Sequence, residues 1–138
     1  MSKILIADDS ALARAFMTRC IQISGIPDCE FFEASNGNEV LKTLESFLPD
    51  LVITDMNMPE CDGMELVKKI KSNPKFSAIP IVVMTSAGNT AQRAELKSLG
   101  VSSILSKPFN PHDVVDIASG LLGNITNTDT NNSEEGEW

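Results

Sequence analysis

The chain has 138 residues, enough for one domain with a substantial core, and its apolar content of 42% is typical of a globular protein. The net charge of −8 argues against a surface for nucleic acid or for anionic membranes. No segment has the apolar length of a signal peptide or a membrane span, and three cysteines at irregular spacing are typical of reduced thiols. We expect a cytoplasmic monomer that neither binds nucleic acid nor enters a membrane.

Short apolar runs occur at five places along the chain. Most are continuously apolar rather than alternating, which is typical of strands that are covered on both faces. The strands expected from them lie at residues 4–7, 31–32, 51–53, 81–84 and 103–105.

Each expected strand is followed by a segment with helical periodicity. Asn36 and Asn110 are placed to cap two of these helices, and Pro111 suits the first helical position. Gly25 and Gly100 are placed to end two others. The residues expected to face the core are, in chain order, Leu12, Phe16, Cys20 and Ile23; Val40, Leu41, Leu44 and Leu48; Leu66, Val67 and Ile70; Ala91, Leu96 and Leu99; and Val114, Ala118, Leu121 and Leu122.

Strand followed by helix, five times over, predicts a doubly wound α/β fold with a parallel sheet. We assign residues 1–123 to this single domain. Residues 124–138 are polar and acidic and show no apolar period, so we predict a disordered acidic tail.

Polar residues follow four of the expected strands. They are Asp8 and Asp9, Asp55, Thr85 and Lys107. Each alone has an ordinary structural explanation, such as a helix start, a loop entry or a surface lysine. Because the carboxyl ends of parallel strands meet at one edge, where ligands bind in such sheets, one shared site is the better explanation for the set.

The residue types at this edge indicate phosphoryl chemistry. Three crowded carboxylates resist ionising together, and a hard cation such as Mg²⁺, which also binds phosphate oxygens, resolves that repulsion. Lys107 adds a positive charge and Thr85 a hydroxyl donor. The chain lacks the glycine-rich motifs of nucleotide sites, so we expect a phosphoryl group to arrive from another molecule and to be accepted by a carboxylate.

The segments "ILIADDS", "VITDMNMPECDG", "IVVMTSAG" and "LSKPF" together resemble the receiver domains of response regulators of the CheY type. The resemblance covers roughly residues 2–123. It implies a flavodoxin-like (βα)5 fold with strand order 2-1-3-4-5. It also implies a stand-alone two-component signalling protein, as in flagellar chemotaxis, that catalyses only its own phosphorylation and dephosphorylation.

The resemblance assigns a role to each residue of the metal site. Asp55 is similar to the phosphoacceptor and is also a Mg²⁺ ligand. Asp9 resembles a direct ligand, Asp8 a ligand acting largely through water, and Asn57 a ligand through its backbone carbonyl.

The remaining roles concern the phosphoryl group itself. Thr85 resembles the switch hydroxyl, and Lys107 resembles the cation on the opposite side, with a cis peptide bond to Pro108. The implied phosphodonor is a histidine kinase. The implied downstream partner is a motor switch component, a phosphatase or a phosphotransfer protein.

One position departs from the family pattern. Three residues before the lysine the family usually has Tyr or Phe, whereas this chain has Ile104, which is stiff at χ1 and has no hydroxyl. We therefore expect the signal to depend more on the loop and helix after Thr85.

Two other functions remain open. A Mg²⁺-dependent phosphatase of the haloacid-dehalogenase type also uses an aspartate nucleophile, but it usually has a second acid where this chain has Asn57. A flavodoxin-like FMN carrier needs a phosphate cradle where this chain has Asp8 and Asp9. Turnover of a phosphomonoester would favour the first, and a coloured protein the second.

Overall fold

Five parallel strands form one sheet in the order β2-β1-β3-β4-β5. The computed structural model describes residues 2–86, 88 and 90–123, so the predicted tail lies outside the described residues. The strands are β1 Ser2–Ala7, β2 Cys29–Ala34, β3 Leu51–Asp55, β4 Ile81–Ser86 and β5 Ser103–Lys107. Their order and direction confirm the predicted doubly wound α/β fold.

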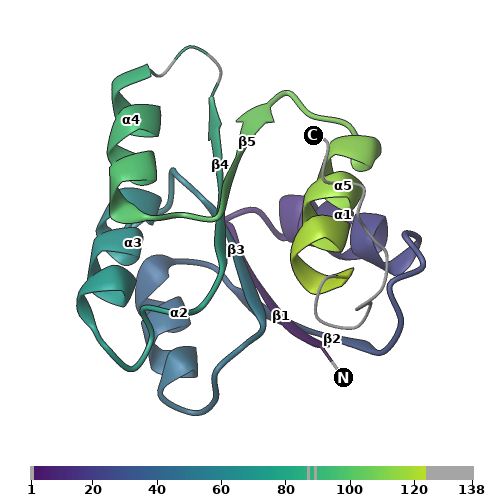
Figure 1. The fold of residues 1–138 in the computed structure, drawn as a ribbon, viewed down its shortest axis with the longest axis horizontal. Coiled ribbons are helices and arrows are strands. Elements are labelled where there is room, and N and C mark those ends of the chain that lie inside the picture. The colour runs from purple at the N-terminus through teal and green to yellow at the C-terminus, as the bar shows by residue number, and fades with distance from the viewer. Residues whose placement is uncertain (1, 87, 89, 124–138) are drawn as a thin grey trace.

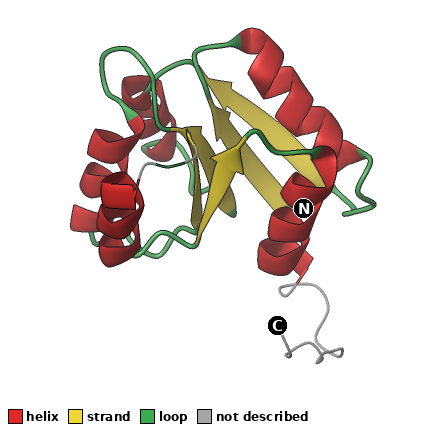
Figure 2. Cartoon of the chain, turned by 90° about the horizontal axis from the view of Figure 1, so that it is seen from above, coloured by secondary structure: helices red, strands yellow, loops and turns green. Residues whose placement is uncertain are grey.

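Helices cover both faces of this sheet, with α2, α3 and α4 on one face and α1 and α5 on the other (Figures 1 and 2). They are α1 Ala11–Gln22, α2 Gly37–Leu44, α3 Gly63–Ser72, α4 Thr90–Leu99 and α5 Pro111–Ala118, with a short π-helix, η1 Ser119–Gly123, continuing α5. Within the described ranges, none of them is both long and apolar enough to cross a bilayer.

The core lies on both sides of the central strands. All of β3, the last four residues of β1 and the first five of β4 are buried, because helices cover both sheet faces. One apolar cluster joins the sheet to α3 and α4 through residues such as Ile70 and Leu96. The other joins it to α1 and α5 through Met17, Ile21 and Val114. This two-sided packing fixes the strand ends that carry the polar residues.

The predicted helix boundaries are largely confirmed. The side chains of Asn36 and Asn110 cap α2 and α5, and Pro111 is the first residue of α5. Gly25 and Gly100 follow α1 and α4 with φ of +89° and +92°, a conformation that favours glycine.

The predicted core face of α1 is wrong. Leu12, Phe16 and Ile23 are exposed, by 82%, 41% and 63%, whereas Met17 and Ile21 are fully buried beside Cys20. Apolar residues occur on several faces of this helix, so periodicity alone does not determine its rotation. That rotation is determined by packing against the sheet and α5.

Two further residues do not lie where the apolar pattern predicted. Leu48 is 52% exposed, because α2 ends at Leu44 and the following Pro49 disfavours helix at the residue before it. Ala91 is also exposed, and Leu96 is the one fully buried residue of α4. The stripe Leu66, Val67 and Ile70 of α3 is buried as predicted.

The corrected face of α1 can be tested by two truncations on the same helix. Met17→Ala should lower the free energy of unfolding by about 2–5 kcal/mol, because it leaves a cavity in a packed core. Leu12→Ala should change it by no more than about 0.5 kcal/mol, because the side chain is mostly in water. Urea denaturation measures both, and a larger loss for Leu12→Ala would contradict this orientation of α1.

Candidate functional site

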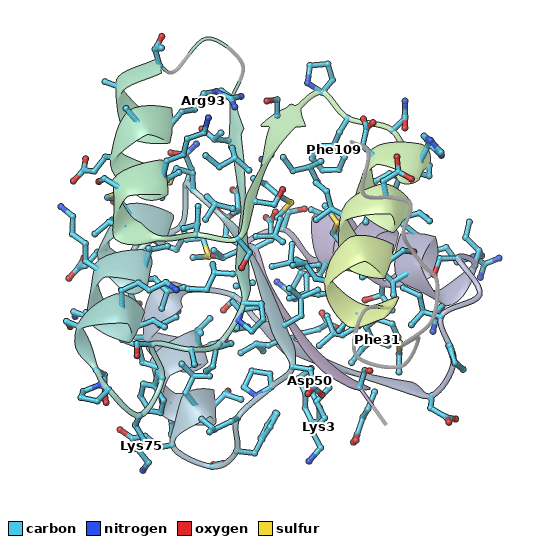
Figure 3. The ribbon with its side chains drawn as sticks, in the orientation of Figure 1. Lys3, Phe31, Asp50, Lys75, Arg93 and Phe109 are labelled. Atoms are coloured by element: carbon cyan, nitrogen blue, oxygen red, sulfur yellow. The ribbon has the colours of Figure 1, made fainter. Side chains whose placement is uncertain are left out.

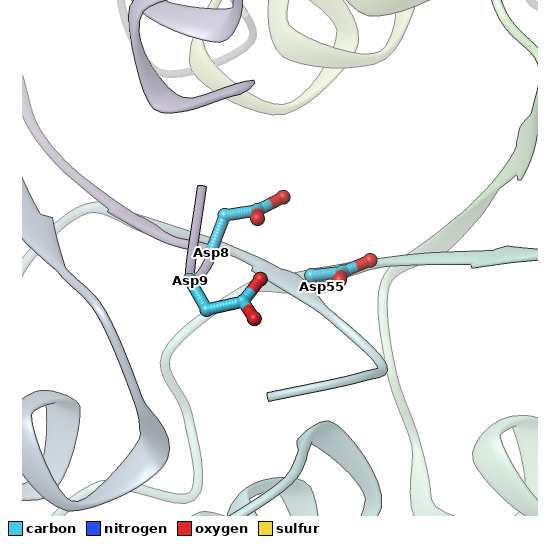
Figure 4. A group of neighbouring side chains, drawn as sticks. All are labelled: Asp8, Asp9 and Asp55. Atoms are coloured by element: carbon cyan, nitrogen blue, oxygen red, sulfur yellow. The ribbon is translucent and has the colours of Figure 1, made fainter. Parts of the chain in front are cut away.

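Three carboxylates meet at one edge of the sheet (Figure 4). Asp8 and Asp9 directly follow β1, and Asp55 ends β3. Strands β1 and β3 are parallel neighbours with Ala7 opposite Thr54, so the residues that follow are brought together by the pairing itself. One oxygen from each carboxylate lies within 4.8 Å of the other two. The predicted cluster is therefore present.

The carboxylates differ in their surroundings. Asp8 and Asp55 are each only 4% exposed, whereas Asp9 is exposed. Burial raises the pKa of the Asp8 carboxyl, and the charges of Asp55 and Asp9 raise it further. A hydrogen bond from the Ser10 backbone N–H to Asp8 Oδ1 (2.9 Å) and the charge of Lys107 oppose that rise. The cluster therefore favours a bound cation.

Lys107 reaches this cluster from the far side of β4. Its Nζ donates to Asp55 Oδ1 at 2.7 Å, although β4 separates β5 from β3. The peptide bond between Lys107 and Pro108 is cis, as predicted. Within the described residues, Asp8 and Asp9 form no salt bridge, so Lys107 balances only part of the acidic charge.

Thr85 contributes a buried hydroxyl at the same edge. The residue is 1% exposed and follows Met84, which pairs with Asp55 across the sheet. Its Oγ1 donates to Gln92 Oε1 over 3.5 Å, longer than an ordinary hydroxyl hydrogen bond. A buried hydroxyl with so weak a partner can donate to another acceptor that binds within its reach.

The loop between β3 and α3 packs against the backbone of Asp55 and restrains it. The Met56 N–H donates to the Met84 carbonyl at 3.0 Å, and the Gly63 N–H donates to the Met56 carbonyl at 2.9 Å. Gly63 packs so tightly that a Cβ there would lie 2.5 Å from the Asp55 carbonyl oxygen. Asn57 lies in this loop with its side chain exposed.

Gln92 and Arg93, in the first turn of α4, were not predicted as part of this region. Gln92 contacts Thr85, and the Arg93 guanidinium donates to the Ser106 hydroxyl. No motif marks either residue. Their contacts depend on the rotation of α4, and the weak apolar stripe of that helix does not predict it.

Cys61 and His112 take no part in the cluster. Burial, followed by the charge of Glu65, raises the pKa of the Cys61 thiol, which disfavours the reactive thiolate. His112 is on the surface of α5, where its Nε2 lies 3.3 Å from Asp116.

The donor set at the acidic edge suits a hard divalent cation. All three side chains offer carboxylate oxygens, which Mg²⁺ and Mn²⁺ prefer, and neither histidine nor cysteine is among them. Because Lys107 balances only part of the charge of the three carboxylates, the remaining negative charge attracts such an ion.

Most of the chain is similar to proteins of one known family. The model of the response regulator receiver domain family matches residues 4–119. The chemotaxis protein CheY1 of Helicobacter pylori is 34% identical over 122 residues, which cover 88% of this chain and 97% of that protein. The chemotaxis response regulator CheY4 of Vibrio cholerae superposes with a TM-score of 0.78 at 30% identity, covering 88% of this chain and 99% of that one. The Mn²⁺-bound form of response regulator Rcp1 has a TM-score of 0.77 at 26% identity, with coverages of 96% and 100%.

The close packing of Gly63 predicts that Gly63→Ala lowers the free energy of unfolding by about 1–3 kcal/mol, because the added methyl overlaps backbone atoms of Asp55 and Met56. Gly120→Ala is the matched control, since a Cβ there meets nothing within 4 Å. Chemical denaturation compares the two variants. Equal stability would show that the loop absorbs the methyl and that Gly63 does not restrain Asp55.

The raised pKa of Asp8 predicts that Asp8→Asn stabilises the metal-free protein at neutral pH, because it removes a buried charge. As the pH falls through the raised pKa, Asp8 takes up a proton in the folded protein before it does so in the unfolded chain. The advantage of the variant should therefore shrink in acid. Denaturation across a pH series measures this, and an advantage that grows in acid would contradict it.

Proposed function

This chain belongs to the response regulator receiver family, and we propose that it accepts a phosphoryl group from a histidine kinase on Asp55. The main support for this proposal is the position of the Asp55 side chain. It is buried, its oxygen is 2.7 Å from Lys107 Nζ, and two further carboxylates lie beside it. Within the described residues, Asp55 is the one member of the acidic cluster that forms a salt bridge, which it makes with Lys107.

In the proposed transfer, an Asp55 carboxylate oxygen attacks phosphorus in line with the bond to the kinase phosphohistidine. The new P–O bond forms as the P–N bond breaks, and its electron pair returns to the imidazole nitrogen, which then takes up a proton. The product is an aspartyl phosphate. The other residues of the site assist this transfer by positioning the reacting groups and neutralising their charge.

Lys107 supplies one part of that neutralisation. Its ammonium group holds Asp55 Oδ1 before the transfer, and its side chain is 41% exposed, so it is free to turn on its flexible stem. We propose that it follows the negative charge from the carboxylate to a phosphoryl oxygen. It would then stabilise the transferring group and the product.

Thr85 supplies a hydrogen-bond donor to the phosphoryl group. Its hydroxyl is buried and its present acceptor is 3.5 Å away, so a phosphoryl oxygen is a stronger partner. We propose that this new hydrogen bond shifts the loop and helix after β4. That shift would change the face that α4, β5 and α5 present to partners.

We propose that Asp8, Asp9, Asp55 and the backbone carbonyl of Asn57 hold Mg²⁺. The oxygen-only donor set supports this, as does similarity to a response regulator solved with Mn²⁺. The bound ion would neutralise charge on the phosphoryl oxygens. The charge of the ion would also favour the ionised form of Asp8, whose pKa is raised by burial.

The family and the relatives support a role in protein signalling. Receiver domains are signalling proteins, and several similar proteins are named as chemotaxis proteins. We propose that this chain transmits a two-component signal, as in chemotaxis, by binding a downstream protein rather than by turning over a substrate. A motor switch component, a phosphatase or a phosphotransfer protein would suit this role.

The phosphoacceptor is tested by incubating the protein with Mg²⁺ and acetyl phosphate, followed by intact-mass measurement. The wild-type protein should gain the mass of one phosphoryl group as acetate is released, and EDTA should prevent the gain. Asp55→Asn should gain none. Asp116→Asn, the same change on the exposed surface of α5, should behave like the wild type. An adduct that persists in Asp55→Asn, or one that is absent from the wild type, would overturn the proposal.

A further inference from the structure

The first turn of α4 is tied to two strand ends by side-chain contacts. Thr85 Oγ1, near the end of β4, donates to Gln92 Oε1 at 3.5 Å. The Arg93 guanidinium donates to the hydroxyl of Ser106, near the end of β5. Figure 3 shows Arg93 between α4 and the ends of these strands. Adjacent residues of one helical turn thus contact adjacent strands.

The two strand residues are also partners in the sheet. Thr85 pairs with Ser106, two positions beyond the pair of Val83 and Ile104, which belongs to the core under α3 and α4. Because side chains alternate along a strand, Thr85 and Ser106 lie on that same face. Both contacts to α4 therefore come from one register position of the sheet.

The two contacts differ in strength. The contact from Arg93 has a charged donor, whereas the contact from Thr85 is long and neutral. A threonine hydroxyl has a single proton, so it donates either to Gln92 or to a phosphoryl oxygen. Phosphorylation of Asp55 would therefore compete for the hydrogen bond from Thr85 to Gln92 and not for the one from Arg93 to Ser106.

From this geometry we infer that Gln92 competes with the phosphoryl group for the Thr85 hydroxyl, while Arg93 keeps α4 attached to β5. This inference rests on the proposed function. Phosphorylation then frees the start of α4 from β4 but not from β5, and the helix pivots about Arg93. In this chain, which has Ile104 in place of the usual aromatic residue, the polar contact between Thr85 and Gln92 would then respond to phosphorylation.

Competition of this kind is reciprocal. If a phosphoryl group at Asp55 displaces Gln92 from Thr85, the Gln92 contact weakens binding of that group by some factor. Removing the Gln92 acceptor must then strengthen the binding by that factor. A contact of this length is weak, so the gain should be about threefold rather than orders of magnitude. Gln92→Leu removes the acceptor and keeps most of the side-chain volume.

The test uses beryllofluoride with Mg²⁺ as the phosphoryl mimic on the full chain. The sequence has two glutamines, Gln22 and Gln92, so selective ¹⁵N-glutamine labelling gives two side-chain amides. We expect the Gln92 amide to shift when beryllofluoride binds and the Gln22 amide to stay. Gln92→Leu should bind beryllofluoride about threefold tighter, and Gln22→Leu, its matched control on exposed α1 surface, should bind like the wild type.

Hydrogen exchange distinguishes the role of Gln92 from that of Arg93. Gln92→Leu should raise exchange in the first turn of α4 only in the free protein, because the bound protein has already lost that contact. Arg93→Leu should raise it in both states.

The outcomes separate this inference from the proposed function. A wild-type protein that binds no beryllofluoride would count against phosphorylation of Asp55. A wild-type protein that binds it while the Gln92 amide stays fixed would overturn the inference and leave the proposed function standing. Because the amide is observed in the unmodified chain, this result does not depend on how any variant folds.

Discussion

The contact between Lys107 and Asp55 is the constraint on which the rest of the structure depends. A buried carboxylate beside two others is electrostatically unfavourable, and one ammonium group at 2.7 Å offsets only part of that repulsion. The lysine must reach across β4, so β3, β4 and β5 must lie side by side. The strand order therefore places Lys107 within reach of Asp55.

The surrounding fold holds this unfavourable cluster together. The central strands are buried on both faces, so the strand ends carrying Asp8 and Asp55 do not move apart when their charges repel. Gly63 lets the next loop pack against the Asp55 backbone, where a larger residue would collide. The two apolar cores stabilise the fold, whereas the repelling carboxylates at the edge of the sheet destabilise it. This distribution suits the proposed site for a cation and a phosphoryl group.

The sequence predicts those features that depend on topology. Parallel strands determine which ends meet, so Asp8, Asp9, Asp55 and Lys107 could be placed together without coordinates. Features that depend on the rotation of a helix could not be predicted in this way. Met17 was missed because α1 has apolar side chains on several faces, and the contacts of Gln92 and Arg93 were missed because α4 has little apolar pattern.

The weak apolar pattern of α4 supports the role proposed for this helix. Leu96 is its one fully buried side chain, whereas α3 buries Leu66, Val67 and Ile70. Displacing α3 would expose a large apolar surface, but displacing the start of α4 exposes little. The position of that first turn is then decided by polar contacts, which a new negative charge can rearrange. Ile104 packs against the same core and has no polar group to exchange, so in the proposed mechanism it would support α4 and the polar contacts would respond to the phosphoryl group.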